Sequence, residues 1–392
     1  MTRSGTSFEW LWETIGVTVS GWNRMRTDVA VIGGGLAGLH TCRLLQAAGV
    51  DFVLLEARDR LGGRILSVDE TGQPSDNGFD LGPSWYWPAI QPGIGRLVEE
   101  LGLAAFGQNS EGDVIFERIS REPAQRYRGA VSGQYSMRLA GGTGALVQAL
   151  SRSLPPSRVL RSARVMAMVL KADAVVLTIA RGDGRVDELT AERVIAALPP
   201  RLLEASVLFT PALEAATAHR WRSTPTWMAP HAKFFALYDR PFWRTAGLSG
   251  TAQSMVGPML EMHDATTASG GAALFGFLGL AAEQRAALGE SEITRLCVDQ
   301  LARLFGADAR TPRATLLKDW AADPFTATAA DRGFGGSIVP DGRPWVTGAW
   351  RNRLALAGSE VSPADAGYLA GAVEAGTLAV EETLRRLSKA GT

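Results

Sequence analysis

Three glycines and one carboxylate are the residues whose types and spacing point most directly to chemistry. Gly33, Gly35 and Gly38 follow the pattern G-x-G-x-x-G, and Glu56 follows about 20 residues later. In this pattern the first glycine permits a tight turn, the second lets backbone N–H groups approach a pyrophosphate, and the third lets a helix pack closely on a strand. The acidic side chain accepts hydrogen bonds from a ribose hydroxyl. The spacing therefore predicts a dinucleotide-binding site.

The residues around this motif predict the elements that hold it in place. An apolar run at 29–32 is typical of a buried parallel strand, and leucines recur at helical spacing over 36–45, where Gly49 ends the pattern. A second apolar run, 52–55, leads directly to Glu56. Because strand, helix, strand and acid are all in register, a glycine-rich turn without a ligand is the weaker interpretation.

Composition and charge favour a globular protein with a small-molecule ligand. The 392 residues allow two domains of ordinary size, and 46% of the side chains are apolar and 20% charged. Lys+Arg and Asp+Glu are both 40, so no net field attracts nucleic acid or an anionic membrane. The two cysteines and four histidines lack the spacing of a disulfide framework or a metal site, and no apolar run is long enough for a membrane span. We expect a cytoplasmic protein without a metal.

Residues 1–26 precede the first predicted strand. Phe8, Leu11, Trp12 and Ile15 recur at helical spacing, which predicts a helix with one apolar face. Acidic residues within this stretch argue against a signal peptide. The helix would dock on its own domain or on a partner subunit, and the second case would make the protein a homodimer. Contact with a membrane surface is the weaker alternative, because the polar face lacks basic residues.

The segment that follows the acid extends the nucleotide site. Gly62 and Gly63 would bring a second backbone segment near the ligand, while Arg58 and Arg64 offer planar donors for phosphate or ribose oxygens. Written as E-A-R-x-R-x-G-G-R, this segment resembles the flavin-containing monoamine oxidase family, and the resemblance covers residues 28 to about 385. It implies that the dinucleotide is FAD.

Further segments carry the resemblance. FDLGPSWYWP (79–88) is similar to the family's strand and turn beside the flavin. LAGGTGALVQAL (139–150) is similar to the glycine turn and helix that return the chain to the FAD domain, and RVIAALPP (193–200) is similar to a strand that ends near the cofactor. The stretch 358–376 is similar to the C-terminal signature, in which a helix points its N-terminus at the flavin ring. The resemblance implies cofactor contacts at Gly33, Gly35, Leu36, Ala37, Gly38, Glu56, Ala57, Arg58, Gly63, Arg64, Gly82, Pro83, Ser84, Trp85, Val165, Gly358, Glu360 and Leu369.

The patterns predict an α/β protein with a Rossmann-like FAD-binding domain and a substrate domain whose mixed or antiparallel sheet is backed by helices. Strands are expected at 231–238, 253–262, 272–278 and 315–320, helices at 281–288 and 293–305, a small antiparallel hairpin between 160 and 190, and a C-terminal helix that begins near Pro363 and Asp365. The predicted organisation is an N-terminal extension (1–26), FAD-binding parts at 27–105, 137–225 and 336–392, a shortened substrate-domain segment at 106–136, and the substrate domain at 226–335.

The resemblance assigns three residues to catalysis. Lys233 stands in the register of the family lysine that holds a water near flavin N5, although a lysine in a strand is by itself more often solvated. Trp320 matches a tryptophan beside the flavin, with a core tryptophan as the open alternative. Tyr368 matches one wall of an aromatic cage that favours the substrate amine. The second wall falls at or near Ile338, so the implied substrate pocket contains Ile338 and Tyr368.

Departures from the family pattern shape the prediction. Ile338 is aliphatic, so the cage is incomplete and the substrate need not be a simple arylalkylamine. The stretch 335–338 has no cysteine, which predicts that FAD is bound non-covalently. Residues 106–136 are too few to rebuild the family's helical segment, so the pocket should be shorter, more open, or closed by another segment such as 1–26.

The predicted function is FAD-dependent oxidation of an amine to an imine, which hydrolyses to an aldehyde or ketone while oxygen is reduced to hydrogen peroxide. Two alternatives share the scaffold: a desaturase or porphyrinogen-type oxidase that acts on an apolar substrate, and a flavin-binding partner protein without catalytic activity. Glu261, Asp264 and Asp365 could each bind the second charge of a diamine, but a solvated surface position is the more ordinary role for each.

Overall fold

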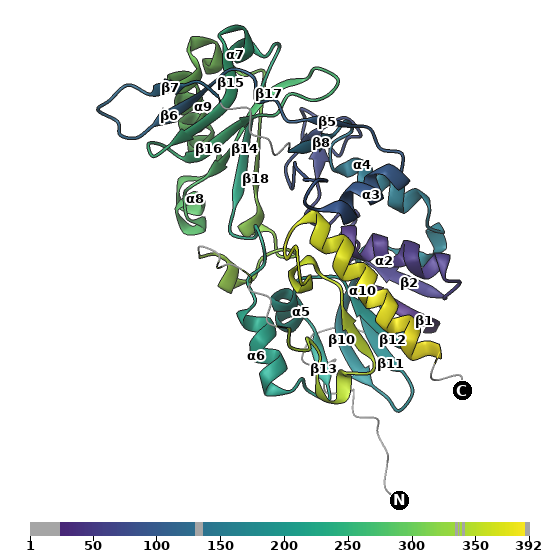
Figure 1. Ribbon diagram of the computed structural model, residues 1–392. Helices are drawn as coiled ribbons and strands as arrows, with labels where there is room; N and C mark the ends of the chain where they lie inside the picture. The colour runs from purple at the N-terminus through teal and green to yellow at the C-terminus, as the bar shows by residue number, and fades with distance from the viewer. Residues whose placement is uncertain (1–23, 130–135, 334–335, 337, 339–341, 389–392) are drawn as a thin grey trace, which may run out of the picture.

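The computed structural model describes residues 24–129, 136–333, 336, 338 and 342–388 (Figure 1). The predicted N-terminal extension therefore lies outside the described residues, apart from 24–26. These three residues belong to strand β1 (Arg24–Ile32), which is longer than its apolar part because Arg24 already pairs with Glu188. Figure 1 shows two lobes, each built on one large sheet.

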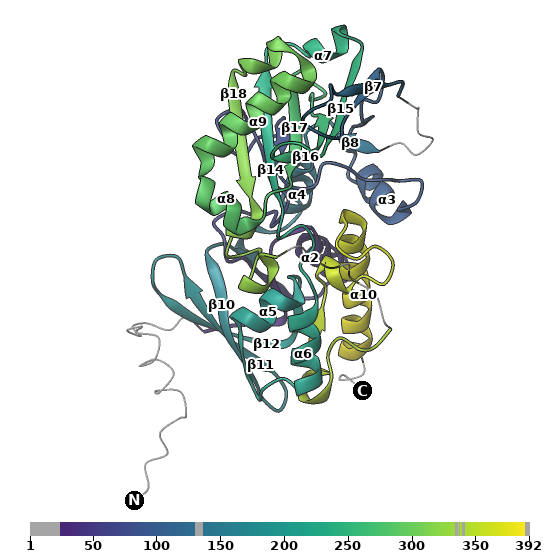
Figure 2. The ribbon, with the colours of Figure 1, turned by 90° about the vertical axis from the view of Figure 1, so that its left-hand side faces the viewer.

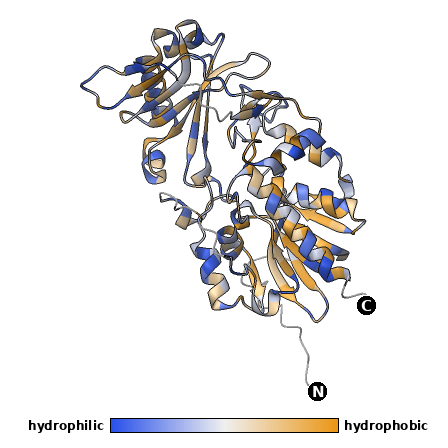
Figure 3. Ribbon diagram, in the orientation of Figure 1, coloured by the Kyte–Doolittle hydropathy of each residue, from blue (hydrophilic) through white to orange (hydrophobic). Residues whose placement is uncertain are grey.

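The first sheet has eight strands and contains the predicted dinucleotide motif. β1 lies between β2 (Phe52–Leu55) and β12 (Val186–Ala196) and is parallel to both, as the buried apolar runs predict. The order of the sheet is β13 (Leu208–Thr210), β10 (Ala163–Leu170), β11 (Val175–Arg181), β12, β1, β2 and β9 (Val159–Leu160), with β19 (Leu354–Leu356) paired to β12. Figure 3 shows hydrophobic residues concentrated on these strands.

The small hairpin expected between 160 and 190 is part of a larger unit. β10, β11 and β12 form an antiparallel meander within the first sheet, so two turns are present rather than one. β12 continues into the parallel pairing with β1, which lengthens it well past a hairpin strand. Alternating residues alone could not reveal this second partner.

Two helices cover one face of this sheet. α2 (Leu36–Ala47) and α10 (Leu369–Ser388) lie side by side in both views (Figures 1 and 2) and share one apolar core. The expectation that the C-terminal helix begins near Pro363 and Asp365 is wrong. Gly367 has a φ of +87°, which no α-helix accommodates, so the helix begins only at Leu369.

The second sheet confirms the mixed, largely antiparallel arrangement. Its order is β18 (Ala314–Asp319), β14 (Ala232–Tyr238), β17 (Ala272–Leu278), β16 (Met259–Asp264), β15 (Leu248–Ser254), β6 (Asp113–Glu117) and β7 (Gln125–Tyr127). The single strand expected at 253–262 is wrong, because a turn with Gly257 at φ +109° separates β15 from β16. β6 and the edge strand β7 come from the short segment 106–136.

Alternation along β14 decides which side chains face the first lobe. Phe234 and Ala236 pack against α9 (Glu290–Phe305), whereas Phe235 and Leu237 face the short strand β4 (Phe79–Asp80). Lys233 stands two residues before Phe235 and therefore shares the face toward β4. The helices α7 (Phe242–Thr245) and α8 (Ala282–Leu288) complete this lobe.

The other strands and helices of the described structure are short. They are β3 (Ser67–Val68) paired with β4, β5 (Ala105–Gly107) paired with β8 (Met137–Leu139), α3 (Pro92–Glu100), α4 (Gly144–Arg152), α5 (Pro200–Ser206) and α6 (Ala215–Ser223). Within the described ranges, no helix has the length and apolar character that crossing a bilayer requires.

Candidate active site

Two of the three fingerprint glycines leave no room for a side chain. Gly33 has a φ of +102°, and a Cβ there would lie 2.7 Å from the carbonyl oxygen of Ala197. A Cβ at Gly38 would lie 1.9 Å from the carbonyl oxygen of Gly33. Both positions therefore require glycine, as the fingerprint predicts. The N-terminus of α2 opens onto a cavity of about 550 Å³, which Leu36 and Ala37 help to line.

Glu56 fixes this turn from the end of β2. Its Oε2 accepts a hydrogen bond from the backbone N–H of Gly34 (2.6 Å), and its Oε1 accepts one from the N–H of Arg58 (2.8 Å). The backbone at Gly62 bridges to Gly35, so a second glycine segment lies against the first, as expected. Glu56 also lines the cavity, which leaves its carboxylate within reach of a ligand hydroxyl.

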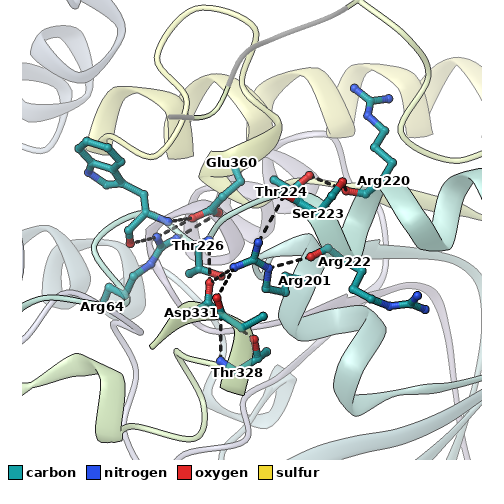
Figure 4. Close-up of polar contacts among 12 residues, drawn as sticks. Arg64, Arg201, Arg220, Arg222, Ser223, Thr224, Thr226, Thr328, Asp331 and Glu360 are labelled. Atoms are coloured by element: carbon teal, nitrogen blue, oxygen red, sulfur yellow. Dashed lines mark hydrogen bonds and ion pairs between the residues drawn. The ribbon is translucent and has the colours of Figure 1, made fainter. Parts of the chain in front are cut away.

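Arg58 and Arg64 line the cavity, but their guanidinium groups already have protein partners. Arg58 donates to Asp323 Oδ1 (2.8 Å) and Thr326 Oγ1 (2.9 Å). Arg64 donates to Glu360 Oε1 (2.6 Å), the ion pair drawn in Figure 4. Contact of either arginine with a cofactor stays a prediction. Both tie the nucleotide segment to parts of the chain that are far away in sequence.

The turn after β4 forms the opposite wall. Gly82 approaches the backbone so closely that a Cβ would lie 1.9 Å from the carbonyl oxygen of Arg64. Pro83, Ser84 and Trp85 follow it along the cavity. The backbone of this turn therefore packs directly against the Gly62–Arg64 segment.

Lys233 is buried where β14 meets this turn. Its Nζ donates to the carbonyl oxygens of Asp80 (3.2 Å) and Gly82 (2.6 Å) and to Ser84 Oγ (2.9 Å). The centre of the Phe275 ring lies 4.6 Å from Nζ. All three N–H groups of a protonated Lys233 therefore have acceptors, and the residue joins the second sheet to the wall of the cavity.

Burial changes the protonation of this site. It lowers the pKa of Lys233 to about 7, with Asp80 opposing the shift and Arg138 adding to it. Burial also raises the pKa of the Asp80 carboxyl group, although its hydrogen bond from Ser67 acts in the opposite direction. Lys233 is thus a mixture of charged and neutral forms near neutral pH, as a lysine with a chemical role would need.

Trp320 and Tyr368 line the same cavity. Trp320 is 4% exposed and donates from Nε1 to the carbonyl oxygen of Leu81 (3.0 Å), so it is both a core residue and a cavity residue. Tyr368 is 39% exposed. Its ring meets two indoles, with ring centroids at 5.5 Å for Trp227 and 6.0 Å for Trp87.

The other predicted positions fall into three cases. Those that line the cavity are Gly35, Ala57, Gly63, Val165, Gly358 and Leu369. Gly38 and Glu360 lie behind its wall, where Gly38 lets α2 approach β1 and the buried Glu360 holds Arg64. Ile338 is half-buried and is not among the described residues that line the cavity, so its place in the substrate pocket stays a prediction.

Sequence reasoning missed several cavity residues and misplaced one acid. Trp87, Trp227, His231 and Phe277 also line the cavity, and so does Glu261, one of the three acids that the sequence offered for a second charge. Trp227 and His231 lie in the segment just before β14, and this segment contains no recognisable sequence motif. The expectation of a solvated Asp264 is wrong: it is 1% exposed and accepts hydrogen bonds from Trp243 Nε1 (2.8 Å) and Arg244 Nε (2.7 Å).

The two ends of the cavity fit the two ends of FAD. The nucleotide end offers a glycine turn, the N-terminus of a helix and the Glu56 carboxylate, which suit a pyrophosphate and a ribose. The other end is lined by aromatic rings and Lys233, which suit a flat ring system. The residues that are present therefore fit the predicted cofactor.

This fold and this cavity define a flavin-dependent oxidoreductase of the α/β class. Residues 120–384 match the family described as flavin containing amine oxidoreductase, and residues 31–101 match the NAD(P)-binding Rossmann-like domain. The chain belongs to the flavin-containing amine oxidoreductase family and is a flavin amine oxidase, which confirms the resemblance seen in the sequence.

Relatives agree over most of the chain. A probable flavin-containing monoamine oxidase A of Dictyostelium discoideum is 23% identical, covering 89% of this chain and 95% of the relative. A putative flavin-containing monoamine oxidase of Mycobacterium tuberculosis is 26% identical, covering 91% and 96%. A putrescine oxidase of Kocuria rosea is 38% identical over a shorter stretch, 25% of this chain and 20% of the relative.

Solved structures share the fold. Wild-type putrescine oxidase bound to putrescine has a TM-score of 0.76 and 20% identity, covering 93% of this chain and 100% of that one. Cyclohexylamine oxidase from Brevibacterium oxydans has a TM-score of 0.76 and 18% identity, covering 92% and 99%. At these identities the likeness establishes the architecture and leaves the substrate open.

Proposed function

We propose that this protein oxidises a small amine with non-covalently bound FAD, that water hydrolyses the resulting imine to an aldehyde or ketone, and that oxygen is reduced to hydrogen peroxide. The observation that supports this proposal is that one cavity contains both the dinucleotide turn at Gly33 and the Lys233 and Tyr368 side chains. Bound FAD would supply the redox chemistry, accepting a hydride equivalent from the amine α-carbon and passing the electrons to oxygen. Cys42 and Cys297 are buried away from the cavity, which favours non-covalent binding.

The side chains of the cavity would prepare the amine for this reaction. The Tyr368 ring attracts a polarised or cationic amine by its quadrupole, and the apolar walls exclude water. When Lys233 loses its proton, Nζ keeps two N–H groups and gains a lone pair, so one of its three acceptors is released. The neutral Lys233 side chain can then accept a hydrogen bond from a water, and the family role of this lysine requires such a water.

The test is anaerobic reduction of the purified yellow protein by a panel of primary, secondary and polyamines. We expect at least one amine to bleach the flavin absorption and, on admission of air, to yield hydrogen peroxide. Acid precipitation should release all of the flavin into the supernatant as FAD. A yellow protein that no amine bleaches would reject amine oxidation and favour the desaturase or non-catalytic alternatives. Flavin that stays in the pellet would reject non-covalent binding.

We further propose that the substrate carries a second positive charge. Of the three acids considered from the sequence, only Glu261 lines the cavity, and a hydrogen bond from His263 Nε2 (2.6 Å) lowers its pKa and keeps it ionised. Asp264 is occupied by its own partners, and Asp365 accepts a hydrogen bond from Gln91 (2.9 Å) outside the cavity. The fold is shared with a putrescine-bound oxidase, which makes a diamine a reasonable first substrate.

Putrescine and butylamine differ by one amino group and separate this proposal from general amine oxidation. In Glu261→Gln we expect KM for putrescine to rise about fivefold, the scale of one partly solvated ion pair, while KM for butylamine stays unchanged. Glu283→Gln, on the exposed surface of α8, is the matched control. Equal effects on both amines would reject a role for Glu261 in binding the second charge.

Three predictions from the sequence remain proposals: the domain division, the cytoplasmic location and the homodimer. Limited proteolysis would test the domain division, cell fractionation the cytoplasmic location, and light scattering the homodimer. Each measurement is independent of the amine that the protein oxidises.

A further inference from the structure

Tyr368 faces two indole rings instead of an open gap. The Trp227 ring lies 5.5 Å from it at an interplanar angle of 40°, and the Trp87 ring lies 6.0 Å from it at 84°. All three rings line the cavity. Two ring faces need a separation of about 7 Å to hold another molecule between them, because each contact takes roughly 3.5 Å. The three rings therefore form a continuous aromatic corner rather than a cage with two separate walls.

The backbone of Trp227 is clamped on both sides by one ion pair. Its N–H donates to Glu360 Oε1 (3.3 Å), and its carbonyl oxygen accepts from Arg64 Nη1 (3.0 Å). Arg64 and Glu360 are themselves 2.6 Å apart, and the Glu360 side chain is completely buried. Figure 4 shows this pair beside the turn. The same ion pair that joins the nucleotide segment to the C-terminal part of the chain therefore also positions the indole.

The neighbours of Trp227 hold the turn in a conformation that it would not adopt alone. Met228 has a φ of +62°, which costs a residue with a side chain about 1 kcal/mol. The N–H of Thr226 donates to Asp331 Oδ1 (3.1 Å), and Asp331 is paired with Arg201 at 2.5 Å (Figure 4). Strain of this kind persists where surrounding contacts fix the backbone, and it recurs at ligand sites.

Gly367, the residue just before Tyr368, leaves the space that the Trp227 indole occupies. A Cβ at Gly367 would lie 2.5 Å from Trp227 Cγ, so any other residue would displace the indole. Its φ of +87° independently favours glycine. The turn before β14 and the turn before α10 are thus fitted to each other at the point where the two rings meet.

We propose that Trp227 is a substrate-binding residue that supplies the second aromatic surface of the amine site, in place of the wall that the sequence suggested at Ile338. The proposal rests on the proposed function, in which an amine binds beside Tyr368. An indole is the strongest of the aromatic rings in attracting a cation. Because Trp227 lies against Tyr368, the amine meets the exposed faces of both rings, and the indole limits how large a substituent can enter beside the tyrosine.

The experiment compares Trp227→Phe, Trp227→Leu and Trp227→Ala with the wild-type holoenzyme. Trp345→Ala is the control, since it removes an indole of the same size that does not line the cavity. Binding of tetramethylammonium, which cannot be converted to an imine, is followed by the change in flavin absorption. Steady-state kcat and KM are measured with an amine that the wild type oxidises and with a bulkier homologue.

Binding of tetramethylammonium should weaken about tenfold in the leucine and alanine variants and less than threefold in the phenylalanine variant, because the ring quadrupole is retained there. KM for the small amine should follow the same order with a smaller effect on kcat, and the alanine variant should gain activity on the bulkier amine. Unchanged binding in both the leucine and alanine variants would overturn the proposal, as would the same loss in Trp345→Ala.

The two proposals fail separately. If no amine reduces the wild-type flavin, the proposed function is rejected, and the binding measurement still decides whether Trp227 contributes a cation-binding surface. If the wild type oxidises amines but the variants keep its affinity and size preference, only the role of Trp227 is rejected. Should the alanine variant fail to fold, the comparison of leucine with phenylalanine carries the same decision.

Discussion

At the scale of single residues, the environment of Lys233 is formed by β4 and by the turn that follows it, both far from Lys233 in the sequence. Strand alternation puts its side chain on the face of β14 that meets β4, and the turn at Gly82 and Ser84 supplies its acceptors. The charge of Asp80 favours the ammonium form and burial favours the neutral form, with burial the larger effect on the pKa. This balance makes the residue sensitive to pH and to substitution.

Lys233→Met should lower the rate of anaerobic flavin reduction by about 100-fold, the scale of one proton-handling group, while leaving FAD bound. The control is Lys318→Met, because Lys318 stands directly opposite on β18. Stopped-flow absorption measures both variants. Equal rates in the two variants would remove Lys233 from the reaction and favour the desaturase alternative.

The depressed pKa of Lys233 also makes stability depend on pH. The pKa is about 7 in the folded protein and returns toward the ordinary value of 10.5 on unfolding, so the unfolded chain binds more protons between these values. The contribution of this site to stability therefore rises between about pH 7 and pH 10.5, by up to about 1.4 kcal/mol per pH unit. Urea unfolding of wild type and Lys233→Met at several pH values measures the difference. A constant difference would contradict burial of an ionisable amine.

At the scale of elements, the glycine turn places the N-terminus of α2 at the cavity. The helix can reach this position only because Gly38 packs its backbone against that of Gly33. The sequence alone indicated this contact, since strand, turn and helix follow each other directly. It could not place α10 next to α2, because that pairing joins opposite ends of the chain.

Gly38→Ala should therefore release most of the flavin and lower the melting temperature by several degrees. Its Cβ would lie 1.9 Å from a carbonyl oxygen, and overpacking of this kind costs about 1–3 kcal/mol. Gly93→Ala in α3 is the matched control, because no atom lies within 4 Å of a Cβ there. The ratio of flavin to protein absorption and a thermal melt give the result. A yellow, stable Gly38→Ala protein would contradict the close approach of α2 to β1.

At the scale of the whole molecule, the cavity is assembled from both lobes and from both ends of the chain. The nucleotide end belongs to the first sheet, Lys233 to the second, and Tyr368 to the turn before α10. Ion pairs such as Arg58 with Asp323 (2.8 Å) cross between these parts. A ligand that fills the cavity should therefore stabilise the fold as a unit.

Removal of FAD should lower the melting temperature by about 5 °C or more, since a ligand at 100 times its Kd adds about 2.7 kcal/mol of stability. Tryptophan fluorescence during heating measures the apo and holo forms, and addition of FAD should restore the original value. Addition of adenine alone is the control. Identical melting temperatures would mean that the cavity does not depend on its cofactor.

Much of the fold and of the cofactor site could be predicted from residues that are close together in the sequence. The dinucleotide turn, Glu56, the second glycine pair and β17 could be predicted because each depends on residues that are adjacent in sequence or repeat at the period of one element. The two-sheet architecture followed from strands clustered before helices. Family resemblance then pointed to Lys233, Trp320 and Tyr368, which the structure brings to one cavity.

Only the tertiary structure decided what surrounds those three side chains. The strand break at Gly257, the late start of α10 after Gly367, and the contact of Trp227 with Tyr368 depend on backbone conformations and on partners more than 100 residues away. A tryptophan in an unremarkable turn carries no sequence signal, because its place is set by the Arg64–Glu360 ion pair and by the space above Gly367. The chemistry could therefore be inferred from the residues, whereas the shape of the substrate site required the fold.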